Sequence, residues 1–507
     1  KKSPAKSAAK KSAAKAGAAR SRSRASVVED DAGPPPEGGT TLVVVESPTK
    51  ARNIGKYLGR AYTVRATVGH VRDLPAKKLG IDIDHGFEPE YVTIEGKEDI
   101  LTDLKRIARG AREVFIATDA DREGEAIGWH VEQFFTKPAR NAVTAPIRRV
   151  LFHEVTKDAV QKALTKPRKI DGDKVDAQQA RRVLDRLVGY KASPVLWKTV
   201  KKGLSAGRVQ TVALRIIVER EREIRAFKPV EYWSVSADLQ KGAQQFVAKL
   251  HQIDGKKPEI HNSAEADTIL EALKGIKQFP VTEVKRREKR KNPSAPFTTS
   301  TLQQEAAKKL GFGSKRTMRL AQDLYEGIDV GGEDGAQGLI TYMRTDSTRV
   351  SEESAAAARE LLLAEYGADH LSATPQLYPS AKANSQDAHE GVRPTFPHIK
   401  PDALLQKKLT ADQFKLYQLI WQRFMSSQMA PAVFDTTTVD FDIKAASREF
   451  QFRSTGSVIK FQGFLALYRE AKEEGDSKAL EDEQALPLLE LNDKVPCKGI
   501  NPKQHFT

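Results

Sequence analysis

Three acidic residues occupy alternate positions in the sequence shortly after a short apolar run. Asp119, Asp121 and Glu123 follow residues 114–117, and a helical pattern begins after them. Oxygen ligands clustered in this way suit Mg²⁺, which proteins bind through one or two carboxylates together with waters and substrate phosphates. The alternative interpretation is an acidic turn in solvent. The pattern therefore identifies these three carboxylates as candidate metal ligands.

A fourth carboxyl group, that of Glu46, follows a similar run at residues 42–45. Such runs are typical of buried parallel strands, whose carboxyl ends meet at one rim of the sheet and bind ligands there. We expect Glu46 to join the metal-binding group, and repulsion by the neighbouring acids should raise its pKa towards neutrality, where it can donate or accept a proton. Lys50, one helical turn further on, could hold a phosphate or assist that transfer. The sequence has no Walker phosphate-binding motif, so it does not indicate an ATP-driven motor.

A tyrosine and an arginine form the second chemical group. Tyr342 and Arg344 flank Met343, so on an extended strand both side chains would point to one face. A phenolate can attack phosphorus, while a guanidinium holds the non-bridging oxygens and stabilises the charge that develops in the transition state. The alternative is a half-buried tyrosine beside a surface ion pair. The spacing predicts a phosphoryl-transfer pair on a strand.

Several basic and polar residues are candidate contacts for DNA phosphates. His389 and Arg393 lie four residues apart and could touch one phosphate, and the alternative is that both are structural residues. The basic run 285–291 is either a solvated linker or a surface that faces DNA. Other candidates lie on one predicted helix and near the start of the next, and these are Arg181, Arg182, Arg186, Arg208 and Gln210.

Composition limits the class of protein. The chain of 507 residues holds 83 Lys and Arg against 67 Asp and Glu, a net charge of +16. Most of this excess lies outside the first 40 residues, which favours a polyanionic partner such as nucleic acid over a basic tail alone, although a generally basic surface is the alternative. The single cysteine, Cys497, excludes a disulfide framework and a zinc site of paired cysteines. No apolar stretch approaches the roughly 20 residues that span a bilayer, and the N-terminal residues do not form a secretory signal.

The hydrophobic pattern divides the chain into an N-terminal arm and three kinds of folded region. Residues 1–40 read as a disordered basic arm and linker, and residues 41–156 as a parallel α/β domain. Residues 157–230 are predicted to be helical. Short alternating strands in 231–296 and 430–507 flank a second helical region, 297–429, which indicates one β domain that the chain enters twice.

Seven short segments, taken in order, resemble the type IA class of bacterial DNA topoisomerases. The resemblance extends over residues 41–507. The segments are VESP at 45–48, GHVRDLP at 69–75, TDADREGE at 118–125, RRVLDR at 181–186, SAGRVQ at 205–210, TYMRTDS at 341–347 and AHE at 388–390.

The resemblance implies a toroidal molecule built from a catalytic Toprim domain, a strand-binding domain, a hinge or arch and a movable gate. These would be residues 41–156, residues 157–230, the two β-rich segments together, and residues 297–429 with the nucleophile. Members of the class continue beyond the hinge, so the expectation is a chain truncated at its C-terminus that holds the first half of the strand-binding domain. We expect this chain by itself to relax supercoils poorly or not at all, while a longer natural chain does so.

The resemblance also assigns roles to residues. The tyrosine matching Tyr342 attacks a phosphodiester of single-stranded DNA, forming a 5′-phosphotyrosyl bond and releasing a 3′-hydroxyl. Arg344 would stabilise the phosphate, Glu46 would carry out acid–base chemistry, and Lys50 and His389 would assist near the scissile phosphate. Mg²⁺ would be held by Glu46, Asp119, Asp121 and Glu123, and DNA would be contacted by His70, Arg181, Arg182, Arg186, Arg208, Gln210 and Arg393.

The expected activity is therefore relaxation of negatively supercoiled DNA without ATP, by a cytoplasmic, nucleoid-associated monomer with no membrane partner. Exchange of a phosphodiester for a phosphotyrosyl ester is nearly isoenergetic, so rejoining needs no fuel. Alternatives within the class are a decatenating enzyme and the topoisomerase half of a reverse gyrase, against which the missing helicase motif argues. Alternatives outside it are a Toprim nuclease or primase, which needs no tyrosine, and a DNA-binding scaffold without catalysis.

Overall fold

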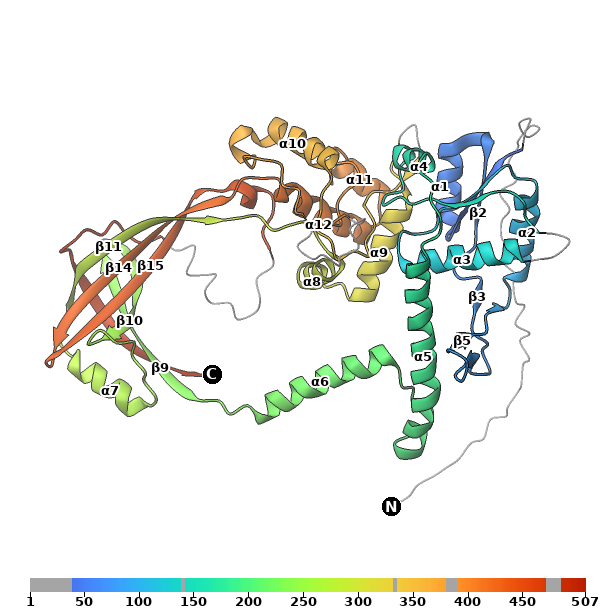
Figure 1. The fold of residues 1–507 in the computed structure, drawn as a ribbon. Coiled ribbons are helices and arrows are strands. Elements are labelled where there is room, and N and C mark those ends of the chain that lie inside the picture. Colours follow the sequence, from blue (N-terminus) through green and yellow to red (C-terminus); the bar gives the residue numbers. More distant parts are fainter. Residues whose placement is uncertain (1–38, 138–141, 332–334, 380–389, 471–484) are drawn as a thin grey trace, which may run out of the picture.

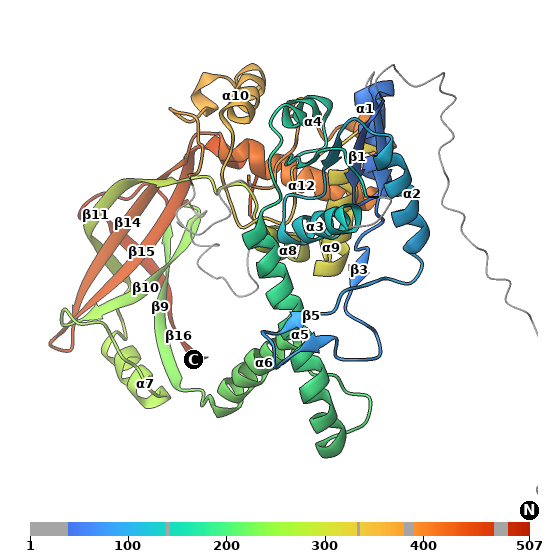
Figure 2. The same cartoon turned by 45° about the vertical axis from the view of Figure 1, so that its right-hand side comes forward.

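The computed structural model describes residues 39–137, 142–331, 335–379, 390–470 and 485–507. These residues form a parallel α/β part, a β-barrel and a helical segment between them (Figure 1). No helix in these ranges combines the length and the apolar character needed to cross a bilayer. The chain leaves the parallel sheet through two long helices, passes through part of the barrel, makes the helical segment and returns to the barrel (Figures 1 and 2).

The parallel sheet has the strand order β2-β1-β7-β8, and every neighbouring pair in it is parallel. The strand β1 is buried along its whole length, and its alternate residues enter two different cores. Leu42 and Val44 pack with α2 and α3, whereas Val43 and Val45 face α1 and the helical segment. The predicted parallel α/β fold class is confirmed. Its elements are β1 (Thr41–Val45), α1 (Pro48–Leu58), β2 (Tyr62–Ala66), α2 (Glu98–Arg109), β7 (Val114–Ile116), α3 (Arg122–Thr136) and β8 (Ile147–Arg149).

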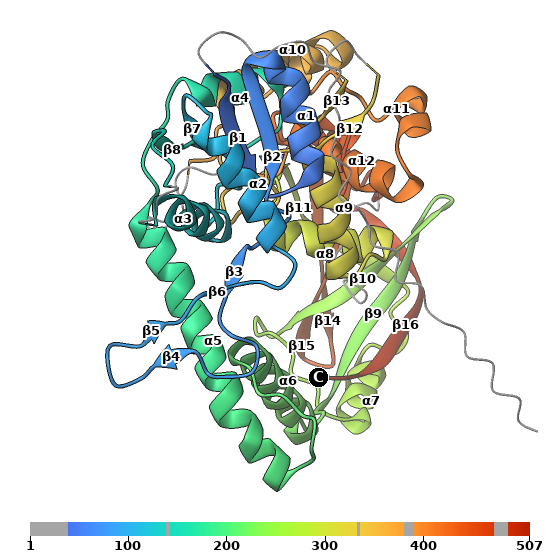
Figure 3. The ribbon, with the colours of Figure 1, turned by 90° about the vertical axis from the view of Figure 1, so that its right-hand side faces the viewer.

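Between β2 and α2 the chain makes an excursion of four two-residue strands, in which β3 pairs with β6 and β4 pairs with β5. Figure 3 shows this excursion beside α5, the long helix that leads away from the sheet. The helix α6 has no buried residue, and its apolar side chains such as Ile216 and Ile217 are more than half exposed. The bounds are β3 (Arg72–Asp73), β4 (Ile81–Asp82), β5 (Glu88–Pro89), β6 (Val92–Thr93), α4 (Lys157–Leu164), α5 (Gly172–Thr199) and α6 (Arg208–Ala226).

Six described strands close into one barrel in the order β10-β15-β14-β11-β16-β9. Three of them precede the helical segment in sequence and three follow it. Phe279 meets the rings of Phe441 and Phe452 edge-on in the barrel core. The elements are β9 (Glu231–Lys241), β10 (Gln244–Ile253), α7 (Ser263–Ala272), β11 (Gln278–Lys291), β14 (Ala432–Ala445), β15 (Arg448–Phe461) and β16 (Lys494–Phe506).

The helical segment packs against the parallel sheet through one continuous apolar core. That core contains Val43, Val45 and Phe115 from the sheet, together with Leu324 and Phe424 from the helical segment. The segment is therefore fixed against the rim where the acidic residues lie. Its elements are α8 (Thr299–Leu310), α9 (Ser314–Glu326), β12 (Ile328–Asp329), β13 (Ala336–Gln337), α10 (Glu352–Tyr366), α11 (Ala403–Lys408) and α12 (Ala411–Ser427).

Candidate active site

The acidic turn after β7 is shaped by the start of α3. Asp121 is the N-cap of this helix, and its Oδ1 accepts a hydrogen bond from the backbone N–H of Gly124 over 2.8 Å. Thr118 closes the turn from the other side, because its hydroxyl donates to the carbonyl of Gly124 over 2.6 Å. A Cβ on Gly124 would lie 2.2 Å from the carbonyl oxygen of Asp119. The turn therefore requires glycine at this position.

Arg149, which was not identified from the sequence, stabilises the same turn by hydrogen bonds to its backbone. This fully buried guanidinium donates to the carbonyls of Ile116 and Asp119 over 3.0 and 2.6 Å. Its Nε also donates to Glu125 Oε2 over 2.9 Å, in an ion pair with no solvent exposure on either side. Arg149 is the second of two adjacent arginines that end β8, and the sequence does not distinguish it from the exposed Arg148.

Glu46, Lys50 and Asp119 form a cluster at the carboxyl ends of β1 and β7. Ser47 caps α1 and accepts from the backbone N–H of Lys50, which fixes that residue in the first turn. The fully buried ammonium of Lys50 bonds to Glu46 Oε1 and to Asp119 Oδ1. Glu46 Oε2 accepts the backbone N–H of Asp119 over 3.2 Å. The sequence prediction of a shared rim thus corresponds to direct contact between the two strand ends.

The surroundings of this cluster bring the pKa of one carboxyl group close to 7. Burial raises the pKa of Glu46 to about 7, with the charge of Asp119 acting in the same direction and that of Lys50 against it. Burial alone would lower the pKa of Lys50, but the carboxylates of Asp119 and Glu46 outweigh it and raise that pKa above its ordinary value. Lys50 therefore stays charged while Glu46 exchanges its proton near pH 7.

Tyr342 reaches this rim from the helical segment. Its hydroxyl donates to Asp121 Oδ2 over 2.6 Å, and its side chain is buried. Burial raises the pKa of the phenol, and the charges of Asp119 and Asp121 add to this effect. The Nη1 atom of Arg344 lies 3.7 Å from the same Asp121 oxygen, although 57% of the arginine side chain is exposed. Asp121 therefore connects the two predicted phosphoryl-transfer residues.

The prediction that Tyr342 and Arg344 lie on one face of a strand is wrong. The backbone bends at Met343 and Arg344 instead of continuing in a ladder. The N–H groups of Thr341 and Tyr342 bond individually to the carbonyls of Arg393 and His153, over 2.9 Å in each case. Tyr342 consequently points into the protein and Arg344 towards solvent.

Tyr325 on α9 is a second tyrosine of the site that the sequence analysis missed. Its hydroxyl donates to Asp119 Oδ1 over 3.1 Å, and the ammonium of Lys50 lies 4.6 Å from the centre of its ring. The ring also packs edge-on against that of Tyr342, with centroids 5.2 Å apart. Tyr325 belongs to the apolar stripe of α9, so its sequence pattern was that of an ordinary core residue.

Glu123 lies at the edge of the site and points to other partners. Its Oε2 is 3.3 Å from His70 Nε2 and accepts from Gln178 Nε2 over 3.0 Å. The hydrogen bond from His70 lowers the pKa of this carboxyl group, although burial opposes it. Glu123 is 43% exposed and does not contact Lys50. It is therefore separate from the cluster around Lys50.

The carboxylates offer the hard oxygen donors that Mg²⁺ prefers, so the residues fit such an ion in their chemistry. Within the described ranges, however, no three His, Cys, Asp or Glu side chains are grouped as ligands of one ion. Lys50 is bonded between Glu46 and Asp119, and Tyr342 is bonded to Asp121. A divalent cation that binds these carboxylates would therefore have to replace their contacts with Lys50 and Tyr342.

The predicted DNA contacts on α5 and α6 are partly engaged with the protein. Arg182 makes a two-pronged ion pair with Asp73, with bonds of 2.8 and 2.6 Å, and it lines a polar cavity of about 250 Å³ together with His70. Arg186 donates to the Leu74 carbonyl over 3.1 Å. Arg208 pairs with Asp185 over 2.9 Å, Gln210 accepts a 3.4 Å bond from Ser205, and Arg181 is exposed.

Two further predicted residues need separate comment. His389 lies outside the described residues. Arg393 is 5% exposed, and its guanidinium bonds to Glu390 over 2.7 Å and to Glu154 over 3.3 Å. The prediction that Arg393 contacts DNA is therefore corrected, since these internal acids already satisfy the buried charge. Arg393 braces the backbone of Thr341 instead.

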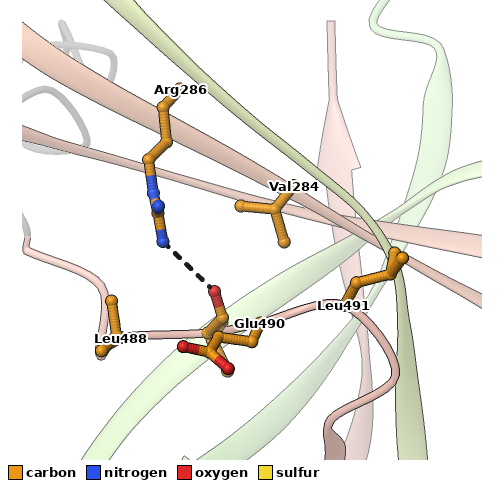
Figure 4. A pocket seen from close by; sticks show the side chains of 6 residues that line it. Val284, Arg286, Leu488, Glu490 and Leu491 are labelled. Atoms are coloured by element: carbon orange, nitrogen blue, oxygen red, sulfur yellow. Dashed lines mark hydrogen bonds between the residues drawn. The ribbon is translucent and has the colours of Figure 1, made fainter.

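A second cavity, of about 440 Å³, lies on the barrel (Figure 4). It is lined by Val284, Arg286 and residues 488–491, and Arg286 donates to the carbonyl of Leu489 over 3.5 Å. The exposed leucines Leu488 and Leu491 border it. None of the acidic residues at the rim of the sheet lines this cavity, so the cavity is separate from the candidate active site.

Comparisons with known proteins agree with the two halves of this site. A family model described as DNA topoisomerase matches residues 169–507, and one described as Toprim domain matches residues 41–155. Among solved structures, the chain is similar to full-length topoisomerase I from Thermotoga maritima, with 37% sequence identity and a TM-score of 0.76. The match covers 92% of this chain and 72% of that chain.

Proposed function

The chain belongs to the bacterial type IA DNA topoisomerases, which are type I isomerases, and from this premise we propose that it relaxes negatively supercoiled DNA without ATP. Tyr342 would cut one strand through a transient 5′-phosphotyrosyl bond, and passage of the other strand and rejoining would follow. The observation that carries this proposal is the 2.6 Å hydrogen bond from Tyr342 to Asp121, which brings a nucleophile from the helical segment onto the acidic rim of the sheet.

The proposed cleavage step conserves bonds. The bond between phosphorus and the 3′-oxygen breaks as the bond between phosphorus and Tyr342 Oη forms. The phenol proton passes to Asp121, which already accepts its hydrogen bond. The leaving 3′-oxygen takes a proton from Glu46, whose pKa of about 7 lets it act as a donor and then, in rejoining, as an acceptor. One phosphate ester replaces another, so the cycle needs no nucleotide.

Charge stabilisation would come from Arg344 and Lys50. The exposed guanidinium of Arg344 can fork onto the non-bridging oxygens of a phosphate that enters beside Asp121. Lys50 keeps its positive charge and holds Glu46 and Asp119 in place. Glu46, Asp119, Asp121 and Glu123 would hold Mg²⁺, and the bound ion would supply positive charge at the phosphates.

Single-stranded, underwound DNA is the proposed partner, with the enzyme acting as a monomer at the nucleoid. The net charge of +16 supports a polyanionic substrate. The exposed Arg181 on α5, together with Arg208 and Gln210 at the start of α6, would contact the strand as it approaches the rim. His70, which borders Glu123, would contact it next to the acidic turn.

The test is covalent trapping. The chain is mixed with a labelled single-stranded oligonucleotide, denatured and examined for a protein–DNA adduct. The wild type is expected to form the adduct and Tyr342→Phe to form none, while Tyr417→Phe, which removes the hydroxyl of another buried tyrosine, remains active. Cutting that persists in Tyr342→Phe would identify a nuclease instead, and absence of any adduct from the wild type would indicate a DNA-binding scaffold.

A further inference from the structure

Tyr325 lies at the centre of the active site, yet the proposed reaction gives it no part. Its side chain is fully buried. Its hydroxyl donates to Asp119, its ring face lies beside the ammonium of Lys50, and its ring packs in a T-shaped arrangement against that of Tyr342. Asp119 accepts from Tyr325 and Lys50 through the same oxygen, Oδ1. One phenol therefore contacts the carboxylate, the cation and the nucleophile at once.

The backbone that carries Tyr325 is fastened to the sheet side immediately behind it. Asn53, on the same helix as Lys50, donates from Nδ2 to the carbonyl of Glu326 over 2.9 Å. Gly327 follows with φ 112°, and a Cβ there would come within 2.6 Å of the same amide nitrogen. Glycine is the residue that accepts both this backbone conformation and this close approach. The end of α9 is thus held against α1.

We propose that Tyr325 is a positioning residue for DNA cleavage, which fixes Asp119 and Lys50 relative to Tyr342. The inference rests on the proposed function and adds a residue to it. The hydroxyl orients the Asp119 carboxylate, and the ring attracts the ammonium of Lys50 by its negative face. Tyr325 and Tyr342 both belong to the helical segment, whereas Asp119 and Lys50 belong to the sheet side. The ring of Tyr325 contacts both sets of residues and so aligns Tyr342 with Asp119 and Lys50.

Two substitutions separate the roles of hydroxyl and ring. Tyr325→Phe keeps the ring beside Lys50 and Tyr342 and removes the hydrogen bond to Asp119. Its single-turnover rate of adduct formation is expected to fall about tenfold, which corresponds to the loss of one hydrogen bond to a charged group. Tyr325→Leu also removes the ring and is expected to be slower still, because the nucleophile then loses its alignment.

Tyr417→Phe is the matched control. Tyr417 is another fully buried tyrosine of the helical segment, and its hydroxyl donates to the carbonyl of Ile399 over 2.6 Å. For each variant, adduct formation at saturating oligonucleotide, the Kd for a fluorescent single-stranded oligonucleotide and the melting temperature are measured. Tyr325→Phe is expected to lose rate at unchanged Kd, with a melting temperature close to that of Tyr417→Phe, whose rate stays at the wild-type level.

Other results would overturn the inference. A wild-type rate in Tyr325→Phe would show that the hydroxyl positions nothing, and an equal loss of rate in Tyr417→Phe would show a general packing effect. If Tyr325→Phe does not fold, Asn53→Ser loosens the same anchor from α1 and must slow adduct formation at unchanged Kd. Failure of the wild type to form any adduct would instead refute the proposed function itself.

Discussion

His130 is a buried imidazole whose charge state couples folding to pH. It lies on α3, 2% exposed, with its ring against those of Tyr91 and Trp129. Its Nδ1 meets no hydrogen-bond partner among the residues that the structure describes. Burial lowers its pKa to about 3, and the charges of Arg72 and His70 act in the same direction. The folded protein therefore holds this ring neutral at a pH where the unfolded chain protonates it.

The sign of the pH effect follows from proton binding. Below pH 6.5 the unfolded state binds more protons at His130 than the folded state does, so stability falls as the pH decreases from 6.5 towards 3. Between pH 7 and 5.5 this single group is expected to cost about 1 kcal/mol of unfolding free energy. His130→Phe should remove that part of the acid sensitivity in urea unfolding curves.

The control for this prediction is His261→Gln, since His261 is exposed. It should leave the difference between pH 7 and pH 5.5 unchanged. An unaltered pH dependence in His130→Phe would mean that the imidazole ring is protonated as easily in the folded protein as in the unfolded chain.

Among individual residues, sequence reasoning found the reactive types but missed their supports. Glu46, Lys50 and Asp119 were expected at one rim because polar residues ended two apolar runs, and the structure has them in contact. Tyr325 and Arg149 were missed because a buried tyrosine in a helical stripe and an arginine at the end of a short strand carry no distinguishing pattern. Their roles depend on which distant carbonyl or carboxylate they meet, and spacing along the chain does not encode that.

At the scale of elements, the ion pair between Arg149 and Glu125 ties β8 to α3 and supports the acidic turn. Arg149→Met leaves a carboxylate buried without its partner and is expected to cost about 3–5 kcal/mol of unfolding free energy. The double variant Arg149→Met with Glu125→Leu should recover much of this loss, because it buries no charge. Equilibrium urea unfolding measures both values.

Comparing the single and double variants separates the effect of the buried charge from that of the hydrogen bonds made by Arg149. Equal losses in both would show that the hydrogen bonds from Arg149 to the carbonyls of Ile116 and Asp119 matter more than the buried charge. A loss below 1 kcal/mol in Arg149→Met would contradict a supporting role for the pair.

Helices and strands could be predicted where the apolar residues followed a single clear pattern along the sequence. The two strand-to-helix units showed continuous apolar runs followed by helical spacing, and β1 and β7 lie where these runs predict. The backbone around Met343 was misread because Tyr342 and Arg344, two residues apart, were taken to lie on an extended strand. Its N–H groups instead find single partners in His153 and Arg393, which come from elsewhere in the chain. A short apolar stretch cannot reveal whether its hydrogen bonds form a ladder.

At the scale of the whole molecule, the basic run 285–291 can now be placed. It forms the C-terminal end of β11, next to the helical segment, where Lys285, Arg287 and Lys289 alternate along the strand and are exposed. The neighbouring strands add hydroxyl groups, including the pair Thr436 and Ser457, whose oxygens lie 3.2 Å apart. Cations interleaved with hydroxyl groups are typical of a surface that contacts phosphates.

Replacement of Lys285, Arg287 and Lys289 by glutamine distinguishes a DNA-facing surface from a solvated strand. If all three contact single-stranded DNA, the slope of log K against log salt should decrease by about 2, with little change in melting temperature. The control replaces the exposed Lys256, Lys257 and Lys277 and should leave the slope unchanged. Equal slopes in the wild type and both variants would favour the solvated strand.

The division of β texture into 231–296 and 430–507 could be read from alternation, and the strands of both segments share one barrel in the structure. The strand order within that barrel could not be read, because it depends on which of several equivalent edges pair. The seating of the helical segment on the sheet was likewise invisible in the pattern. It depends on complementary shapes of side chains such as Phe115 and Leu324 in a shared core.

The pairing of β11 with β14 runs out to Lys291 opposite Ala432, so both ends of the intervening block leave the barrel at the same rung of one ladder (Figure 1). If the helical segment moves away from the sheet during the proposed strand passage, β11 and β14 must twist or bend together, because their hydrogen-bonded ladder continues to the point where the segment begins and ends. The stiffness of this two-stranded ribbon would then help to set how far Tyr342 travels from Asp121 and how accurately it returns.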